Sequence, residues 1–407
     1  MTEIVHSGRW TRDDRAAGMW PRLPFDVPAG RSGISVSLAY DDSGGAVVDL
    51  GCEGAAGWRG WSGGARRSFS IGAREATPGY LPGPLEPGEW YVVLGLHRIP
   101  PGGVGYEVRV SVGVTVKEPR AVEPVPAERP PRRDLPALPG TRWLACDFHS
   151  HTVHSDGTLT VPQLAVRAAA RGLDVLAVTD HNTISHHAEL AEASARYGVL
   201  LLPGQEVTTD TGHANAFGPI GWVDFREPAS SWLAAVSRAG GLLSINHPLA
   251  ADCGWLRPLH PRPPLAEVWH CTWLEPTWNG PLAWWRAAGL DTIPIGGSDF
   301  HVPGQHAELG RPVTWVAVPD GGPSPVDAVL DALRAGRTAV SADVADPGCP
   351  VLLRLGDELV AVDAEGALLM APDGTRLPIR SARENVPAAS GGHLLLSPDG
   401  AVLALSA

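Results

Sequence analysis

Long apolar runs and a secretion signal are missing from this sequence of 407 residues. No window approaches the roughly eighteen uninterrupted apolar residues that a membrane-spanning helix needs, so we expect no membrane partner. The N-terminus, MTEIVHSGRWTRDDR, is polar and lacks the apolar core of a signal peptide. Together these absences predict a cytoplasmic protein.

Cysteine is sparse and follows no pattern. The five cysteines show no C-x-x-C spacing, so neither a disulfide framework nor a thiolate zinc site is indicated. Free buried thiols in a reducing compartment are the simplest interpretation of Cys52, Cys146, Cys253, Cys271 and Cys349.

Positive charge is also in short supply. The net charge of −12 argues against a general nucleic-acid or anionic-membrane binder. Bound divalent cations would reverse that sign locally, so a single nucleotide could still bind. The composition, 44% hydrophobic and 19% charged, is that of a soluble globular protein.

The chain divides into four predicted parts. Residues 1–117 hold short β-branched or aromatic segments between Gly, Pro and Asp turns, which predict a β-sandwich accessory domain. Residues 118–141 are proline-rich and predict an extended linker. Residues 142–342 alternate strand and helix patterns in about seven units, which favours a closed parallel barrel. Residues 343–407 predict a small C-terminal β appendage that packs on the barrel or on a second subunit of a homo-oligomer.

The most informative stretch is Cys146–Thr160. His149 and His151 are two residues apart, so on an extended strand they face the same side and can bind one cation together. His154 and Asp156 follow at once. An apolar run precedes these residues and a helical pattern follows them, which places them at the C-terminal end of a strand, where α/β folds build their sites.

The same residue types end almost every later strand. Imidazole and carboxylate are the usual ligands of Zn²⁺, Mn²⁺ and Fe²⁺, and a carboxylate can bridge two ions. About nine candidate ligands exceed what one ion can use. We therefore expect two or three divalent ions, with Glu206 as the natural bridge. The later strand ends carry Asp180, His181, Glu206, His213, His247, Asp299 and His301.

In this order, the motifs HSH, SDG, TDHN, GQE, GH, NHP and SDFH resemble the PHP family, named for polymerase and histidinol phosphatase. The resemblance covers residues 144–342. It implies an α/β protein built on a distorted seven-stranded (β/α) barrel. Family members cleave phosphomonoesters or phosphodiesters, including small nucleotides and short RNA.

The resemblance also implies three metal sites. The family varies between histidine and aspartate at the Asp156 position, so His154 competes with Asp156 there; the context Ser155-Asp156-Gly157 favours Asp156. The implied ligands are His149, His151, Glu206 and Asp299 for the first ion, Glu206, His213 and His247 for the second, and Asp156, His181 and His301 for the third.

Two bond types are compatible with such a centre. We favour a phosphoester of a small molecule, with clustered ions activating water and with Glu206 and Asp299 as catalytic residues. The wording LLPGQEVTT and GHANAFGPIGWVDFR is most similar to the branch that includes carbaryl hydrolase, so a carbamate or carboxyl ester is the alternative. A non-catalytic metal-binding scaffold is a remote third reading, since degenerate members would be expected to lose ligands.

Substrate contacts are less well marked. Asn182 and His270 follow strands and could reach substrate or simply pack. Arg311 could meet a phosphate, although such an arginine is commonly in a surface ion pair. His186 and His187 are expected to be exposed or to lie behind the ligands. A group of tryptophans would wall a pocket for an aromatic substrate or nucleobase, or pack against the N-terminal domain: Trp269, Trp273, Trp278, Trp284 and Trp285.

Overall fold

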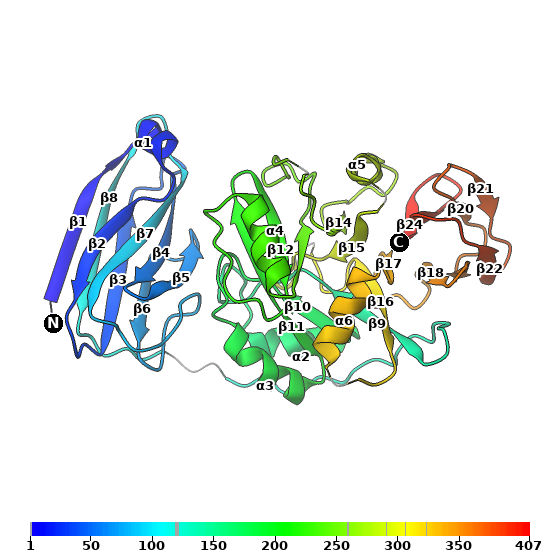
Figure 1. Cartoon of the computed structure of the whole chain (residues 1–407), viewed down its shortest axis with the longest axis horizontal. Coiled ribbons are helices and arrows are strands. Elements are labelled where there is room, and N and C mark those ends of the chain that lie inside the picture. The colour runs from blue at the N-terminus through cyan, green and yellow to red at the C-terminus, as the bar shows by residue number, and fades with distance from the viewer. Residues whose placement is uncertain (1, 119–121, 259, 290, 306, 323) are drawn as a thin grey trace. The chain divides into compact units, whose positions relative to one another are not determined.

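The computed structural model describes residues 2–118, 122–258, 260–289, 291–305, 307–322 and 324–407 (Figure 1). The chain forms two compact units. The first comprises Met1–Val122, Val153–Asp156 and Asp180–Ala188, and the second comprises Glu123–Thr152, Gly157–Thr179 and Glu189–Ala407. No helix within the described ranges is long and apolar enough to cross a membrane.

The first unit is built from two antiparallel four-stranded sheets. Its elements are β1 (Thr2–Trp10), α1 (Arg12–Ala17), β2 (Arg22–Val27), β3 (Gly33–Tyr40), β4 (Val47–Gly54), β5 (Gly57–Gly63), β6 (Ser68–Gly72), β7 (Gly88–Arg98) and β8 (Val104–Val112). One sheet has the order β1-β8-β3-β6 and the other β2-β7-β4-β5.

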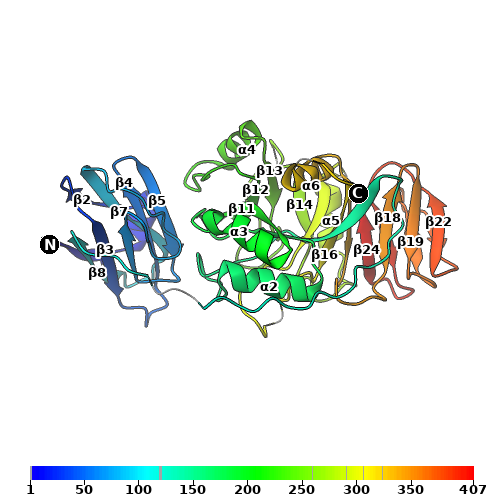
Figure 2. The same cartoon turned by 90° about the horizontal axis from the view of Figure 1, so that it is seen from below.

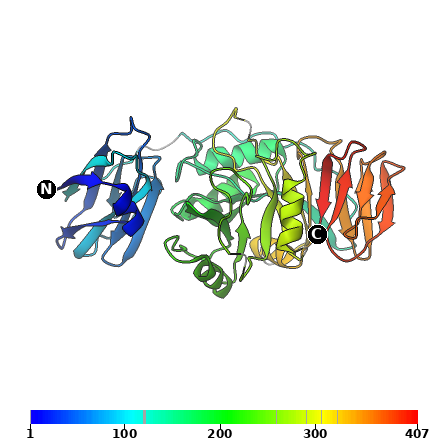
Figure 3. The same ribbon diagram turned by 90° about the horizontal axis from the view of Figure 1, so that it is seen from above.

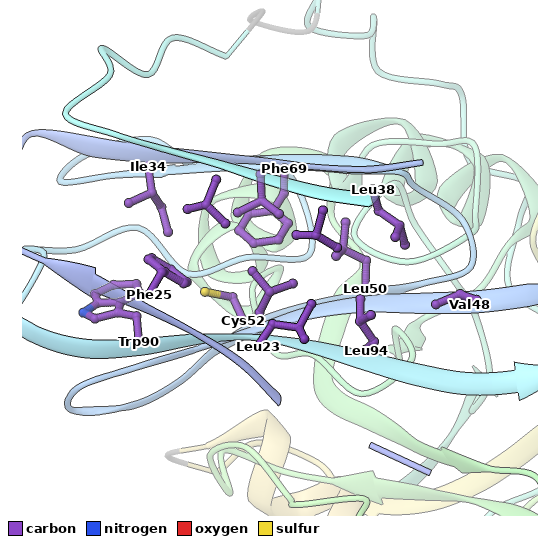
Figure 4. Packing of buried hydrophobic residues seen from close by; sticks show 14 of the residues in the cluster. Leu23, Phe25, Ile34, Leu38, Val48, Leu50, Cys52, Phe69, Trp90 and Leu94 are labelled. Carbon is purple, nitrogen blue, oxygen red and sulfur yellow. The ribbon is translucent and has the colours of Figure 1, made fainter. Parts of the chain in front are cut away.

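Alternation along these strands builds the core of the first unit. In β2, every second residue is buried, as expected when successive side chains point to opposite faces of a sheet. Figure 4 shows side chains from both sheets in this core, with Ile34 and Phe69 on one sheet and Phe25 and Leu50 on the other. Face-to-face packing of this kind is typical of a β-sandwich.

The second unit is organised around one large sheet. Its strands are β9 (Thr141–Asp147), β10 (Val175–Val178), β11 (Leu200–Thr209), β12 (Gly212–Phe217), β13 (Leu242–Ile245), β14 (Leu265–His270), β15 (Ile293–Gly297), β16 (Val313–Pro319), β17 (Thr338–Ser341), β20 (Leu368–Met370), β21 (Arg376–Pro378), β23 (His393–Leu396) and β24 (Val402–Ser406). The strand order is β15-β14-β13-β12-β11-β10-β9-β16-β17-β24-β23-β20-β21.

The expectation of an all-parallel barrel is wrong. β12 pairs antiparallel with both β11 and β13, and β16 pairs antiparallel with β9. The physical reason is the short turn Asp210-Thr211, which can join only a hairpin, because a parallel connection needs a crossover of about a dozen residues. Thr314 Oγ1 on β16 nevertheless lies 2.7 Å from Gly296 N on β15, so the two strands are in contact.

Helices of the second unit cover this sheet. They are α2 (Val161–Arg171), α3 (His187–Tyr197), α4 (Ala229–Arg238), α5 (Gly280–Ala288) and α6 (Pro325–Arg334). α2 begins at a capping box formed by Thr160 and Gln163 and ends at Gly172 in the left-handed region. Alternate residues of β10 then pack on different cores: Leu176 contacts the α2 side, and Ala177 the side that α6 covers.

The C-terminal residues extend the large sheet. β24 pairs antiparallel with β17, so the sheet runs on into the C-terminus. A second sheet, of β18 (Val351–Leu355), β19 (Glu358–Val362) and β22 (Arg383–Pro387), lies beside it (Figure 2). Figure 3 shows α5, in yellow-green, beside the red C-terminal strands, and a Cβ atom at Gly392, just before β23, would lie 2.1 Å from the Trp285 ring of α5.

Candidate metal centre

The first histidines follow directly after β9. His149 and His151 are fully buried, and their ring centroids are 5.0 Å apart. Asp147, the last residue of β9, accepts hydrogen bonds from the backbone N–H groups of His149, Ser298 and Gly310 at 3.2, 3.1 and 2.8 Å. Burial raises the pKa of Asp147 to about 6. This carboxyl fixes the loop that carries the first histidines.

Glu206, on β11, lies at the middle of the cluster. Its carboxylate is fully buried and accepts a hydrogen bond from Asn246 Nδ2 at 2.9 Å. Histidines from other segments approach the same carboxylate. The distances are 3.3 Å from His149 Nε2, 3.1 Å from His213 Nδ1 and 3.3 Å from His247 Nε2, all to Oε1, and 3.5 Å from His151 Nε2 to Oε2.

Asp299 closes the other side of the cluster. Its Oδ1 lies 3.2 Å from His149 Nε2 and 3.1 Å from His151 Nε2. Burial alone would raise the pKa of Asp299, but the two imidazoles hold that pKa well below its ordinary value. Asp299 also adopts a φ of 52°, in the left-handed region that non-glycine residues rarely occupy and that often marks functional sites.

His149 is surrounded by negative charge. Burial lowers the pKa of its imidazole, yet Glu267, Asp299 and Glu206 outweigh burial and raise this pKa well above its ordinary value. Three carboxylates around one buried ring create a site that favours a cation.

Glu267, on β14, was missed by the sequence prediction. Its Oε1 lies 2.8 Å from His149 Nδ1, and its Oε2 accepts a hydrogen bond from the His247 backbone N–H at 2.9 Å. A carboxylate that holds the outer nitrogen of a histidine leaves Nε2 to bind a metal. A charged residue inside an otherwise apolar strand, LAEVWH, was the signal available in the sequence.

His213 and His247 both lie close to Cys253. β12 is a regular strand, so His213 is anchored by its pairing with Thr208 on β11. Cys253 Sγ lies 3.5 Å from His247 Nδ1, and the ligand atoms of His213, His247 and Cys253 lie within 4.8 Å of one another. The scattered cysteines gave no hint of this proximity.

Asp156 and His181 belong to the first unit. His181 Nε2 lies 3.5 Å from Asp156 Oδ1, whereas His154 Nδ1 lies 2.7 Å from Ser185 Oγ. Asn182 is buried with a φ of 54°. These distances favour Asp156 over His154 as the partner of His181.

The two neighbouring histidines differ in exposure. His186 is fully buried, with Nδ1 at 3.1 Å from Asp180 Oδ2, which excludes the exposed position and leaves the expected alternative, a place behind the candidate ligands. His187 is half-buried at the start of α3.

His301 and His270 are the remaining candidate histidines of the second unit in this cluster. The His301 ring stacks on His151 with centroids 4.1 Å apart, and its Nδ1 lies 2.7 Å from the Asp299 carbonyl oxygen. His270 Nε2 lies 3.5 Å from Asp299 Oδ2. The Arg311 side chain is 65% exposed, and its Nε lies 4.0 Å from Asp343 Oδ2, as in the surface ion pair that was the alternative for this residue; its contact with substrate stays a prediction.

A cavity of about 570 Å³ opens beside the cluster. The candidate ligands His247, Glu267, His270, Asp299 and His301 line it. Apolar and aromatic residues also line it: Pro248, Leu249, Ala250, Ala251, Val268, Trp273, Trp278, Pro281 and Ala307. The cavity therefore opens onto the candidate ligands.

The donor set fits divalent ions. His149 Nε2 is buried and has no hydrogen-bond partner among the described residues, although two carboxylates lie close to it. Ligand atoms of His149, His151 and Asp299 lie within 4.8 Å of one another. Imidazole nitrogen and carboxylate oxygen in this arrangement suit Zn²⁺, Mn²⁺ or Fe²⁺.

Comparison with known families agrees with this geometry. Residues 147–247 match the PHP domain. The PHP match includes the ligands from His149 to His247 and ends before Glu267, His270, Asp299 and His301. Of those four residues, Glu267 alone is placed in the cluster by the structure without a prediction from the sequence.

Curated relatives share the PHP segment. A 3′,5′-nucleoside bisphosphate phosphatase from Chromobacterium violaceum is 43% identical over 101 residues, which is 25% of this chain and 32% of the relative. A 5′-3′ exoribonuclease from Escherichia coli K12 is 43% identical over 65 residues, 16% of this chain and 22% of the relative. The chain thus spans about a third or less of the length of these relatives.

Similar solved structures are more distant. A two-domain protein from Bacteroides vulgatus with a PHP-like metal-dependent phosphoesterase domain is 21% identical, with a TM-score of 0.45 over 69% of this chain and 99% of that chain. A metal-dependent phosphoesterase from Bifidobacterium adolescentis is 22% identical, with a TM-score of 0.30 over 40% of this chain and 90% of that chain.

Proposed function

We propose that this protein is a metal-dependent hydrolase that cleaves small phosphoesters with two or three divalent ions. The observation that carries the proposal is His149 Nε2, which is buried 3.3 Å from Glu206 Oε1 and 3.2 Å from Asp299 Oδ1 while Glu267 holds Nδ1. The relatives named as a phosphatase and an exoribonuclease support phosphoester chemistry.

Two ions are assigned from the contacts. The first is assigned to His149, His151, Glu206 and Asp299, and the second to Glu206, His213 and His247. Glu206 joins both sets, because histidines of both sets face its carboxylate. The set Asp156, His181 and His301 stays a prediction. Bound ions would supply activated water near neutral pH and offset negative charge on the substrate.

The protein's own groups can move a proton. His270 Nδ1 lies 2.9 Å from Thr272 Oγ1, which orients the ring, and Nε2 faces Asp299 Oδ2 at 3.5 Å. His270 and Asp299 both line the cavity. In this proposal Thr272 Oγ1 orients the imidazole through Nδ1, and His270 donates the proton of Nε2 to the departing oxygen instead of to Asp299.

A carbamate or carboxyl ester hydrolase is the second candidate. The apolar cavity wall beside the ligands accommodates an aryl carbamate as well as an aryl phosphate. The resemblance to the carbaryl hydrolase branch points the same way. A non-catalytic scaffold is disfavoured, because the predicted ligands are all present.

The contact between β15 and β16 is compatible with a distorted barrel. The seven-stranded form of this barrel stays a prediction.

A substrate panel tests the proposal. Protein reconstituted with Mn²⁺, Fe²⁺ or Zn²⁺ is assayed with 4-nitrophenyl phosphate, bis(4-nitrophenyl) phosphate and a 4-nitrophenyl carbamate. We expect phosphoester hydrolysis, reduced about 100-fold or more in His149→Ala, because the first ion loses a ligand. His97→Ala, an exposed histidine of β7, is the matched control and should keep full activity. Hydrolysis of the carbamate alone would favour the second candidate, and no hydrolysis by a fully metallated protein would contradict both.

A further inference from the structure

The cavity beside the candidate metal centre is lined by two main kinds of side chain. Besides the candidate ligands and a few polar residues, proline, leucine, alanine, valine and tryptophan side chains line it, and we call these the apolar wall. A substrate that reaches the candidate ligands with its phosphoryl group places its leaving group in the rest of this cavity. The apolar wall therefore affects which leaving groups are accepted.

Trp278 is the most exposed aromatic residue of the wall. Its side chain is 53% exposed, and Leu249 is 42% exposed. The Trp278 ring packs over Gly280, where a Cβ atom would lie 2.3 Å from ring atom Cζ2. Large apolar side chains left open to solvent beside a cavity mark a binding surface.

Buried contacts support the segment behind the Trp278 ring. Trp273 is buried, and its Nε1 donates a hydrogen bond to the Trp278 carbonyl oxygen at 3.0 Å. The Trp273 ring packs on Trp269 with centroids 5.3 Å apart. This hydrogen bond fixes the backbone of Trp278, so its ring can stack on a flat ring of the substrate.

Positive charge is missing from this wall. None of the described residues that line the cavity is lysine or arginine, and Asp252 adds a negative charge to the lining. Bound metal ions would concentrate all positive charge at the candidate ligands. A second phosphate on the leaving group would meet apolar side chains and a carboxylate, at a cost in desolvation and repulsion.

We propose that this site selects phosphoesters whose leaving group carries one flat, uncharged aromatic ring that stacks on Trp278, and that it rejects substrates with a second phosphate. The inference rests on the proposed function. The apolar wall lies after residue 247, outside the PHP match, so the match itself does not indicate this selectivity. The ring could be an aryl group or a nucleobase.

Matched substrates test the selectivity. Benzyl phosphate and cyclohexylmethyl phosphate share a primary alcohol leaving group, so they differ mainly in ring flatness. We expect kcat/KM to favour benzyl phosphate about tenfold, and Trp278→Ala to abolish the preference through KM. Trp278→Phe should restore most of it. Trp284→Ala, a half-buried tryptophan of α5 that is not among the described cavity residues, is the matched control.

Charge is tested with nucleotides. Adenosine monophosphate should be cleaved at least about tenfold more efficiently than adenosine 3′,5′-bisphosphate, and Asp252→Lys should narrow that gap. Comparison of adenosine monophosphate with 1-naphthyl phosphate distinguishes a nucleobase from a simple aryl ring. Equal turnover of the mono- and bisphosphate by the wild type would overturn the charge argument.

A binding measurement separates this inference from the proposed function. Calorimetry of 1-naphthol with the full-length protein needs no turnover. Binding that weakens about tenfold in Trp278→Ala supports the wall assignment even if no phosphoester is cleaved. Equal binding by the variant, or equal kcat/KM for the benzyl and cyclohexylmethyl esters, overturns it and leaves the hydrolase proposal standing.

Discussion

At the scale of single residues, Glu267 orients the imidazole of the candidate ligand His149. Both of its carboxylate oxygens are used, one by His149 Nδ1 and the other by the His247 backbone N–H. It thus ties together ligands assigned to two different ions. His247 also has a φ of 25°, and the hydrogen bond to Glu267 helps to hold this unfavourable backbone.

Replacing Glu267 tests this positioning role. In Glu267→Gln an amide of the same shape loses the charge that orients His149, and we expect metal affinity to fall about 10- to 100-fold. Competition with a chelator measures the change. Glu192→Gln, an exposed glutamate of α3, is the matched control. Unaltered affinity in the Glu267 variant would show that the carboxylate does not orient a ligand.

At the scale of secondary-structure elements, the packing of β15 on β14 depends on one glycine. A Cβ atom at Gly297 would lie 2.1 Å from Glu267 Oε1 and 2.8 Å from His149 Cβ. No side chain larger than hydrogen fits there without moving a buried carboxylate. The close approach of these strands brings Asp299, two residues after β15, to the cluster.

Gly297→Ala should therefore destabilise the second unit. Overpacking of a filled interior costs about 1–3 kcal/mol, which denaturant unfolding would detect. Gly348→Ala is the control, because a Cβ atom there meets its nearest neighbour at an ordinary 3.5 Å. If both variants unfold at the same denaturant concentration as the wild type, the strands are less tightly packed than these distances indicate.

Much of the element pattern could be predicted, since local signals mark it. Thr160 and Gly172 delimit α2, and strand ends carry most of the candidate ligands. Other features depend on tertiary contacts that no local pattern records. The direction of β12 follows from its pairing, Glu267 is hidden inside a buried strand, and Cys253 reaches His247 through a loop.

At the scale of the whole molecule, the candidate ligand motifs are divided between the two units. The segments with Asp156 and His181 are grouped with the β-sandwich. Within that unit, Ser185 Oγ accepts a hydrogen bond from Gly79 N at 3.1 Å, and Arg66 donates to the Ser155 carbonyl oxygen at 3.0 Å. These partners are far apart in sequence, so the sequence could not indicate that the sandwich holds both loops.

The metal content of Glu206→Gln tests whether one buried carboxylate serves two metal sites. Wild-type protein reconstituted with Mn²⁺, Fe²⁺ or Zn²⁺ and analysed by mass spectrometry of its metals should hold about two or more ions per chain. Glu206→Gln should lose at least one of them together with hydrolysis, because its carboxylate faces the histidines of two assigned sites. Glu192→Gln should match the wild type. A Glu206→Gln protein that is fully metallated and active would contradict the account.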